Sequence, residues 1–346
     1  MIILNIFAKK PFLIADVGNN FLKIVQSNNI SNMDAAKSAI NQAKSCGFDA
    51  VNFEAYHLKN LFSRDYVEYL SKEPITSHFF KFDGFGYEEF RELADYCHDV
   101  KISFLATPMD FESADYLEEL VDVYKISSHD LTNIPFIKHV ASKDKPILLN
   151  TGGATMKEIK DAVRVIEEES LVDIAIMHSV LSYPTSYDDA NLLMIKDLVN
   201  NFPDYEIGYC DYTEVDDDLL ILTTAYNYGA VVLEKQFTCD NIPTDNSCAI
   251  TYDEVIKFKS KIAFLSKING RINKQPLICE SFARNETRRS IVAKTDIKKG
   301  ELISEDKITF KMPSIGISPA EVEEVIGKKA KMDIFKDNLI DFDMLD

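Results

Sequence analysis

The chain has 346 residues, of which 46% are hydrophobic and 27% charged, a composition typical of a soluble globular protein. The formal net charge of −18 argues against binding to nucleic acid or to an anionic membrane surface, because both select for Lys and Arg. No apolar run is long enough to span a membrane, and the six cysteines show no CxxC spacing. We therefore expect a cytoplasmic protein with reduced thiols.

Short apolar runs that end in polar residues alternate with segments of helical spacing along most of the chain. The predicted strands are 12–17, 50–55, 102–106, 123–126, 146–149, 174–177, 207–210 and 231–233. The predicted helices are 33–46, 87–98, 111–121, 134–142, 155–168, 192–201, 219–228 and 252–265. Eight strand-then-helix units in about 260 residues predict a (β/α)8 TIM barrel over residues 1–266. A doubly wound open sheet is the alternative, but no Gly-rich nucleotide loop follows the first strand.

Three segments do not fit the repeat of strands and helices. Residues 56–85 form a long connection, and connections of this length are usually functional loops or lids. Residues 267–284 lose all periodicity and are predicted to be a linker. Residues 285–346 contain short strand-like runs at 290–293 and 308–310 between turn-rich pieces, which indicates a small second domain.

Polar residues stand at the ends of the predicted strands, where TIM barrels carry their catalytic groups. We assign catalytic roles to Asp16, Glu54 and Glu234, and a substrate-binding role to Asp211. Lys235 alternates with Glu234, so its side chain should point into the helix layer instead. That leaves a single clear cation in the predicted mouth of the barrel, at residue 125.

Twelve short motifs occur in an order and spacing that resembles the sialic acid synthase family. In the barrel they are 14–18, 106–108, 124–128, 145–152, 183–184, 191–192, 202–203, 207–211 and 233–238, and in the small domain 288–290, 296–301 and 325–330. In that family a (β/α)8 barrel precedes a C-terminal antifreeze-like (SAF) domain. Its members condense phosphoenolpyruvate with N-acetylmannosamine or a related sugar and release phosphate.

The resemblance implies roles for the residues that match. Thr107, Lys125 and Ser128 stand where the family holds phosphoenolpyruvate. The positions that contact the sugar are occupied by Tyr183, Asp245 and Asp16. The family also implies a homodimer in which the C-terminal domain covers the partner's barrel mouth.

Several positions depart from the family pattern. The two histidines that bind a divalent metal (Mn or Mg) are Tyr212 and Gln236 here, and neither side chain is a good ligand for such an ion. The lysine that holds the phosphate is Asn52, the His after the first-strand motif is Asn20 or its neighbour, and the Arg before a proline in the small domain is Met312.

The metal site is therefore expected to be absent, or rebuilt from other strand-end groups such as His178, Asp211 and Glu234. A hydrogen-bonded polar ring without an ion explains these groups equally well, and His178 alone fits a buried histidine with satisfied hydrogen bonds.

Three functional hypotheses follow. The first is a divergent synthase that condenses phosphoenolpyruvate with N-acetylmannosamine or a related amino sugar to a nonulosonic acid. The second is an enzyme on the same scaffold with a different sugar-derived substrate. The third is a non-catalytic homologue that acts as partner or regulator of an active synthase.

Overall fold

The computed structural model describes residues 7, 11–18, 20–70, 84–238 and 247–346. The chain divides into two compact units, Met1–Ile268 and Asn269–Asp346. Among the described residues, no helix is both long enough and apolar enough to cross a membrane. The five cysteines in the described ranges are all free thiols, as expected from their spacing.

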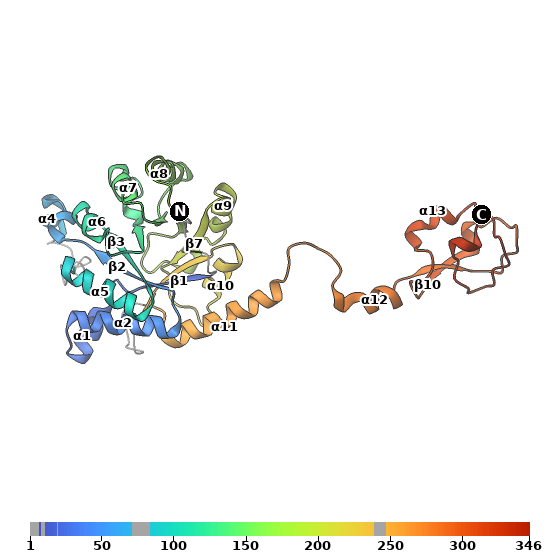
Figure 1. The fold of residues 1–346 in the computed structure, drawn as a ribbon, viewed down its shortest axis with the longest axis horizontal. Helices are drawn as coiled ribbons and strands as arrows, with labels where there is room; N and C mark the ends of the chain where they lie inside the picture. The colour runs from blue at the N-terminus through green and yellow to red at the C-terminus, as the bar shows by residue number, and fades with distance from the viewer. Residues whose placement is uncertain (1–6, 8–10, 19, 71–83, 239–246) are drawn as a thin grey trace. The chain divides into compact units, whose positions relative to one another are not determined.

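The first unit is a closed barrel of eight strands in sequence order, which confirms the predicted (β/α)8 fold (Figure 1). Its strands are β1 (Phe12–Asp16), β2 (Ala50–Ala55), β3 (Ser103–Pro108), β4 (Val123–Ile126), β5 (Ile147–Asn150), β6 (Ile174–His178), β7 (Glu206–Asp211) and β8 (Val232–Gln236). All neighbours are parallel, and β8 closes the barrel against β1, where Leu13 pairs with Leu233.

The helices that follow the strands lie outside the barrel (Figure 1). They are α2 (Asn32–Cys46), α5 (Tyr87–Val100), α6 (Phe111–Leu117), α7 (Ile134–Ala141), α8 (Met156–Glu169), α9 (Leu193–Asn201), α10 (Leu220–Asn227) and α11 (Tyr252–Asn269). The predicted capping box of α8 is present, because Thr155 accepts a hydrogen bond from the Glu158 amide and Glu158 accepts one from the Thr155 amide.

Three α-helices of the first unit were not predicted. Helix α1 (Phe21–Asn28) follows the first strand, and α3 (Leu58–Leu61) and α4 (Arg64–Leu70) lie in the long connection after β2. The remainder of that connection, 71–83, lies outside the described residues. Asn20, a residue type that is common at helix N-caps, precedes α1, but its side chain makes no cap hydrogen bond there.

Successive residues of each strand face opposite sides of the barrel wall. One set packs against the helices, and the other fills the barrel interior. The inner set is apolar at one end, and its buried members are Phe7, Phe12, Ile14, Ala50, Leu105, Val123, Leu148, Ala175, Met177, Cys210, Tyr212 and Val232. Toward the C-terminal ends of the strands the inward-facing residues are polar. We call that end the mouth of the barrel.

The second unit has its own core, built around the antiparallel pair β9 (Ser290–Ala293) and β10 (Ile308–Lys311). Isolated bridges such as Val292–Leu339 and Ala330–Leu345 tie its turns together. The segment predicted to be an unstructured linker is partly helical, since α11 extends to Asn269 and α12 spans Ser281–Glu286. Residues 269–286 are exposed, which explains why the sequence shows no apolar periodicity there.

Candidate active site

A cavity of about 1630 Å³ opens at the C-terminal ends of the strands. Its described lining includes strand-end residues from β1, β2, β3, β4 and β5, and residues of the connection after β2 such as Asn60 and Tyr66. Small-molecule pockets usually measure about 300–1000 Å³, so this one has room for two reactants. Asp16, Glu54, Thr107, Lys125 and Tyr183 all line it.

Asn52 joins strands β1, β2 and β3 at the mouth. Its Nδ2 donates a hydrogen bond of 3.2 Å to Asp16 Oδ1, and its Oδ1 accepts one of 3.0 Å from Thr107 Oγ1. Both side-chain ends of Asn52 are thus used, and Asp16 and Thr107 are held in fixed positions. The residue that replaces the family's lysine is therefore a structural bridge between two residues predicted to bind substrate.

Lys125 and Glu234 form a buried ion pair across the mouth. Lys125 Nζ donates to Glu234 Oε1 at 2.8 Å, and the two side chains are 5% and 0% exposed. Burial opposes the lysine's charge, but the charge and hydrogen bond of Glu234, together with Cys210 and Asp16, outweigh it and raise the pKa of Lys125. Burial also raises the pKa of Glu234, against the attraction of Lys125. Glu234 Oε2 is buried without a hydrogen-bond partner among the described residues.

Glu54 is half-buried beside this pair, and its carboxyl group titrates near neutral pH. Burial raises the pKa of Glu54 to about 7, and the charges of Asp16 and Glu234 act in the same direction against Lys125. A carboxyl group with a pKa near the working pH can both take up and release a proton, as general acid–base catalysis requires.

Hydrogen-bond donors lie on the part of the barrel rim that runs from β3 to β6, which we call the donor arc. The hydroxyls of Ser128 and Ser179 share a hydrogen bond of 3.1 Å, and the Gly152 amide donates to Ser128 Oγ at 3.0 Å. A Cβ on Gly152 would lie 2.9 Å from both hydroxyls, so glycine is required for this close approach. Asn150 also lines the cavity, and its Oδ1 is buried without a partner among the described residues.

Tyr212 and Gln236, at the family's two histidine positions, both line the cavity. The Tyr212 ring meets the Tyr183 ring edge-on at 4.6 Å between centroids. Burial raises the pKa of Tyr212 well above its ordinary value, so the side chain stays a neutral phenol. Tyr183 is 54% exposed and forms the outer part of this aromatic pair.

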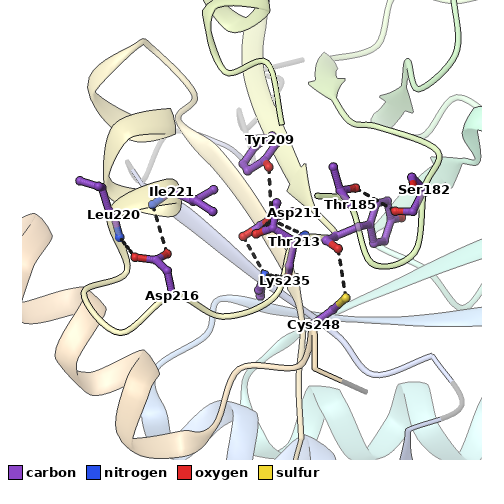
Figure 2. A network of polar contacts seen from close by, with 11 residues as sticks. Ser182, Thr185, Tyr209, Asp211, Thr213, Asp216, Leu220, Ile221, Lys235 and Cys248 are labelled. Carbon is purple, nitrogen blue, oxygen red and sulfur yellow. Dashed lines mark hydrogen bonds and ion pairs between the residues drawn. The ribbon is translucent and has the colours of Figure 1, made fainter. Parts of the chain in front are cut away.

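Asp211 and Lys235 lie on the other side of the barrel wall (Figure 2). Lys235 Nζ donates to Asp211 Oδ2 at 2.8 Å and to the Thr213 carbonyl at 2.7 Å. Asp211 Oδ1 also accepts hydrogen bonds from the Tyr209 hydroxyl and from the Thr213 amide and hydroxyl. The outward direction predicted for Lys235 is confirmed. Asp211 was predicted to bind substrate, but its position in this buried network turns it away from the cavity.

His178 also faces the helix layer. Its Nε2 lies 3.0 Å from the Ala190 carbonyl, its ring stacks on Tyr209, and burial lowers its pKa. It is a buried histidine with a satisfied hydrogen bond. The three side chains considered for a rebuilt metal site are therefore not brought together, because two face outward and Glu234 is paired with Lys125.

The donor set does not fit the family's divalent metal. A neutral phenol and a carboxamide stand at the two imidazole positions, and within 7, 11–18, 20–70, 84–238 and 247–346 no three His, Cys, Asp or Glu residues are placed to hold an ion. The predicted sugar contact Asp245 lies outside the described residues.

Asn52, Asn150 and Ser179 have no role assigned from the sequence. Asn52 was noted only as a departure from the family, and its bridging hydrogen bonds depend on Asp16 and Thr107 from other strands. Asn150 was not considered, although it is a polar residue at the end of a predicted strand. The same signal, a polar residue at the C-terminal end of a predicted strand, identified Glu54 and Lys125.

A closed parallel barrel with ionisable side chains gathered at the carboxyl ends of its strands is the architecture of a TIM-barrel enzyme. Residues 39–274 match the model of the NeuB family, and residues 288–346 match that of the SAF domain. The chain belongs to the NeuB family of sialic acid synthase-like enzymes.

Individual relatives agree with this assignment. The chain is 36% identical to an uncharacterized protein of Methanocaldococcus jannaschii, over 92% of each chain. It is 31% identical to the N,N'-diacetyllegionaminic acid synthase of Campylobacter jejuni, over 96% of this chain and 99% of the relative. The crystal structure of spore coat polysaccharide biosynthesis protein spsE from Bacillus subtilis superposes with a TM-score of 0.61 at 29% identity, covering 98% of this chain and 96% of that one.

Proposed function

We propose that the protein condenses phosphoenolpyruvate with the aldehyde group of an amino sugar, N-acetylmannosamine or a relative, to give a nonulosonic acid and phosphate. The observation that supports this is the division of the mouth into two arcs. At the strand ends, Lys125 of β4 lies beside the donors Ser128, Gly152 and Ser179, and the carboxylates of Glu234, Asp16 and Glu54 lie at β8, β1 and β2. The lining residues Asp110 and Asp130 also lie on the donor side, where Asp110 caps α6 and Asp130 accepts a hydrogen bond from Asn133. An anionic reactant and a polyhydroxy reactant would each meet complementary groups.

The donor arc suits phosphoenolpyruvate. Its phosphate and carboxylate are anionic, and such groups bind most strongly to charged or hydroxyl donors. Lys125 supplies the charge, and the Ser128 and Ser179 hydroxyls, which share one hydrogen bond, have one hydrogen left to donate to the anion. The Thr107 hydroxyl donates its hydrogen to Asn52. Lys125 is the sole Lys or Arg among the described lining residues, so binding depends strongly on this side chain.

The acidic arc suits the sugar and the proton transfers. Carbon 3 of phosphoenolpyruvate forms a bond to the aldehyde carbon, water adds to carbon 2, and the bond between carbon 2 and the phosphate oxygen breaks. The two protons of the water end on the new hydroxyl and on the phosphate. Glu54, with its pKa of about 7, is the group we assign to accept a proton from that water, while Asp16 accepts hydrogen bonds from sugar hydroxyls.

The test is release of inorganic phosphate from phosphoenolpyruvate in the presence of a panel of 2-amino and 2-acetamido hexoses. The Lys125→Ala variant should lower kcat/KM for phosphoenolpyruvate by about 100-fold or more, because it removes the cation from a buried pair. Lys160→Ala is the matched control, since Lys160 is exposed on α8 and bonds only Asn201 in the described contacts.

Two results would contradict the proposal. Release with another class of sugar alone would indicate a different substrate on this scaffold. No release with any acceptor from a protein whose circular dichroism shows a folded barrel would favour the non-catalytic homologue.

We also propose that the protein is a homodimer in the cytoplasm, as the family resemblance implies. The mass of one chain is 39.3 kDa, so light scattering coupled to size-exclusion chromatography should give about twice that value. A mass equal to one chain would contradict it.

A further inference from the structure

Among the residues that the structure describes, the mouth presents no set of side chains that could hold a divalent metal against the aldehyde oxygen. In forming the new carbon–carbon bond, electrons move onto that oxygen, and the reaction needs a group there that withdraws negative charge. The two positions that would place imidazoles at this point carry Tyr212 and Gln236. The chain must meet the same chemical demand with different atoms.

Tyr212 has the properties that this demand requires. Its pKa is raised by burial, so it keeps its proton, and a phenolic hydroxyl can rotate its hydrogen toward a ligand oxygen. It lines the cavity and lies near Glu234 and Cys210 of the inner face, whose charged forms raise its pKa further. The edge-on contact with Tyr183 fixes the plane of its ring.

The main chain at Tyr212 is also held firmly. Its carbonyl accepts hydrogen bonds from the Thr185 amide at 2.9 Å and from the Cys248 thiol at 3.0 Å. On either side of it, Asp211 and Thr213 are bound to Lys235 in the outward network of Figure 2. Fixed donors stabilise developing charge well because they need no reorganisation during the reaction.

We propose that Tyr212 takes the place of the family's metal ion: its hydroxyl donates a hydrogen bond to the aldehyde oxygen of the amino sugar, and the condensation proceeds without a divalent metal. This inference rests on the proposed function of the site. No extra reactant is needed, because Tyr212 acts by hydrogen bonding and the protons come from the attacking water as described above.

The first experiment measures phosphate release by protein that has been stripped of metal with a chelator. Rates with chelator and with added Mn²⁺ should agree within about twofold, because no step uses the ion. Loss of activity in chelator that Mn²⁺ restores would overturn the inference.

The second experiment removes the hydroxyl and keeps the ring. Tyr212→Phe should lower kcat by about 100- to 1000-fold with little change in KM for phosphoenolpyruvate, the size of effect seen when one oxyanion donor is removed. Tyr205→Phe is the matched control, because its hydroxyl donates to Glu167 beside the start of β7, at the opposite end of the strand. A Tyr212→Phe variant within about twofold of wild type would overturn the inference.

The third experiment does not depend on catalysis. The double variant Tyr212→His with Gln236→His restores two imidazoles on the inner face, and it should bind Mn²⁺ in a titration followed by electron paramagnetic resonance. The wild-type protein should show no saturable binding. Gln236→His alone serves as a second variant if the double variant does not fold, and it should bind Mn²⁺ more weakly than two imidazoles would.

Failure of the proposed function gives a different result from failure of this inference. If wild type releases no phosphate with any acceptor, with or without Mn²⁺, the proposed condensation is wrong, and the role of Tyr212 in it falls too. The manganese titration still decides the metal question in that case. Saturable binding of Mn²⁺ by wild type would overturn the claim that this site holds no metal.

Discussion

Neighbouring residues at the ends of β7 and β8 lie in two different environments. Asp211 and Lys235 face the helices and satisfy each other completely within a buried network (Figure 2). Tyr212 lines the cavity, and Glu234 faces the barrel interior beneath it, where its Oε2 has no hydrogen-bond partner among the described residues. The polar groups on the outward side bond one another, and the inward side keeps polar atoms available to a ligand.

Residues on the outward face therefore contribute mainly to stability, and residues on the inward face contribute mainly to the reaction. The outward groups match the family motifs, while the family's two histidines on the inward side have been replaced. A framework that depends only on the outward face can therefore keep its shape while the inner surface changes. Substitutions on the two faces should have different measured consequences.

The largest effect is expected from Lys235→Met. It leaves Asp211 buried without its cation, which should lower the free energy of unfolding by about 3–5 kcal/mol in urea denaturation at pH 7. The double variant Lys235→Met with Asp211→Asn should recover part of the loss, because no unpaired charge remains. A single-variant loss under about 1 kcal/mol would show that the network does not hold the two strand ends together.

A smaller effect is expected from Glu54→Gln, and it depends on pH. The folded pKa of Glu54, about 7, is above the ordinary value of 4.5, so the folded state binds the proton more tightly. The resulting stabilisation is complete below pH 4.5 and is lost as the pH rises through 7, by at most about 3 kcal/mol because water in the cavity screens the charge.

Thermal unfolding of wild type and Glu54→Gln should therefore be compared from pH 5 to pH 8. Relative to wild type, the variant should gain stability toward pH 8, since it has no charge to bury. Wild-type kcat should rise with a midpoint near pH 7 if Glu54 is the base, and this rise should be absent in the variant. Parallel curves for the two proteins would show that Glu54 does not titrate near neutral pH.

The smallest effect is expected from Cys248→Ala. It removes the thiol that donates to the Tyr212 carbonyl, while the Thr185 amide still binds that oxygen. Stability should fall by about 1 kcal/mol or less, and kcat by no more than a few-fold. A loss of kcat as large as that of Tyr212→Phe would mean that the thiol, and not the network around Asp211, positions the tyrosine.

The fold followed from the sequence because the barrel depends on local patterns. Mainly apolar runs of three to six residues marked every strand, and the alternation along β8 gave the outward direction of Lys235 correctly. The same alternation, applied to β6 and β7, places His178 and Asp211 outward with Ile176 and Tyr209. Their assignment to the mouth relied on position at a strand end without that check.

Other features of the site could not be predicted from the chain. Lys125 and Glu234 are 109 positions apart, and their contact depends on how far each side chain reaches across the closed barrel. The pKa of Glu54 depends on burial and on charges from three other strands, none of which is local in sequence. The resemblance to the synthase family indicated the site residues, but their pairing depends on the three-dimensional packing of the closed barrel.

The apolar plug of the barrel interior, with Phe7 packed edge-on against Phe12 at 5.5 Å, has a kinetic consequence. It blocks the end of the barrel opposite the mouth, so reactants pass through the mouth in both directions. A molecule seated on Lys125 lies beneath anything held by Tyr183 at the rim. Binding should therefore be ordered, with the deeper reactant entering first. An excess of the outer reactant should inhibit the enzyme, because it would bind at the rim and block access to the empty inner site.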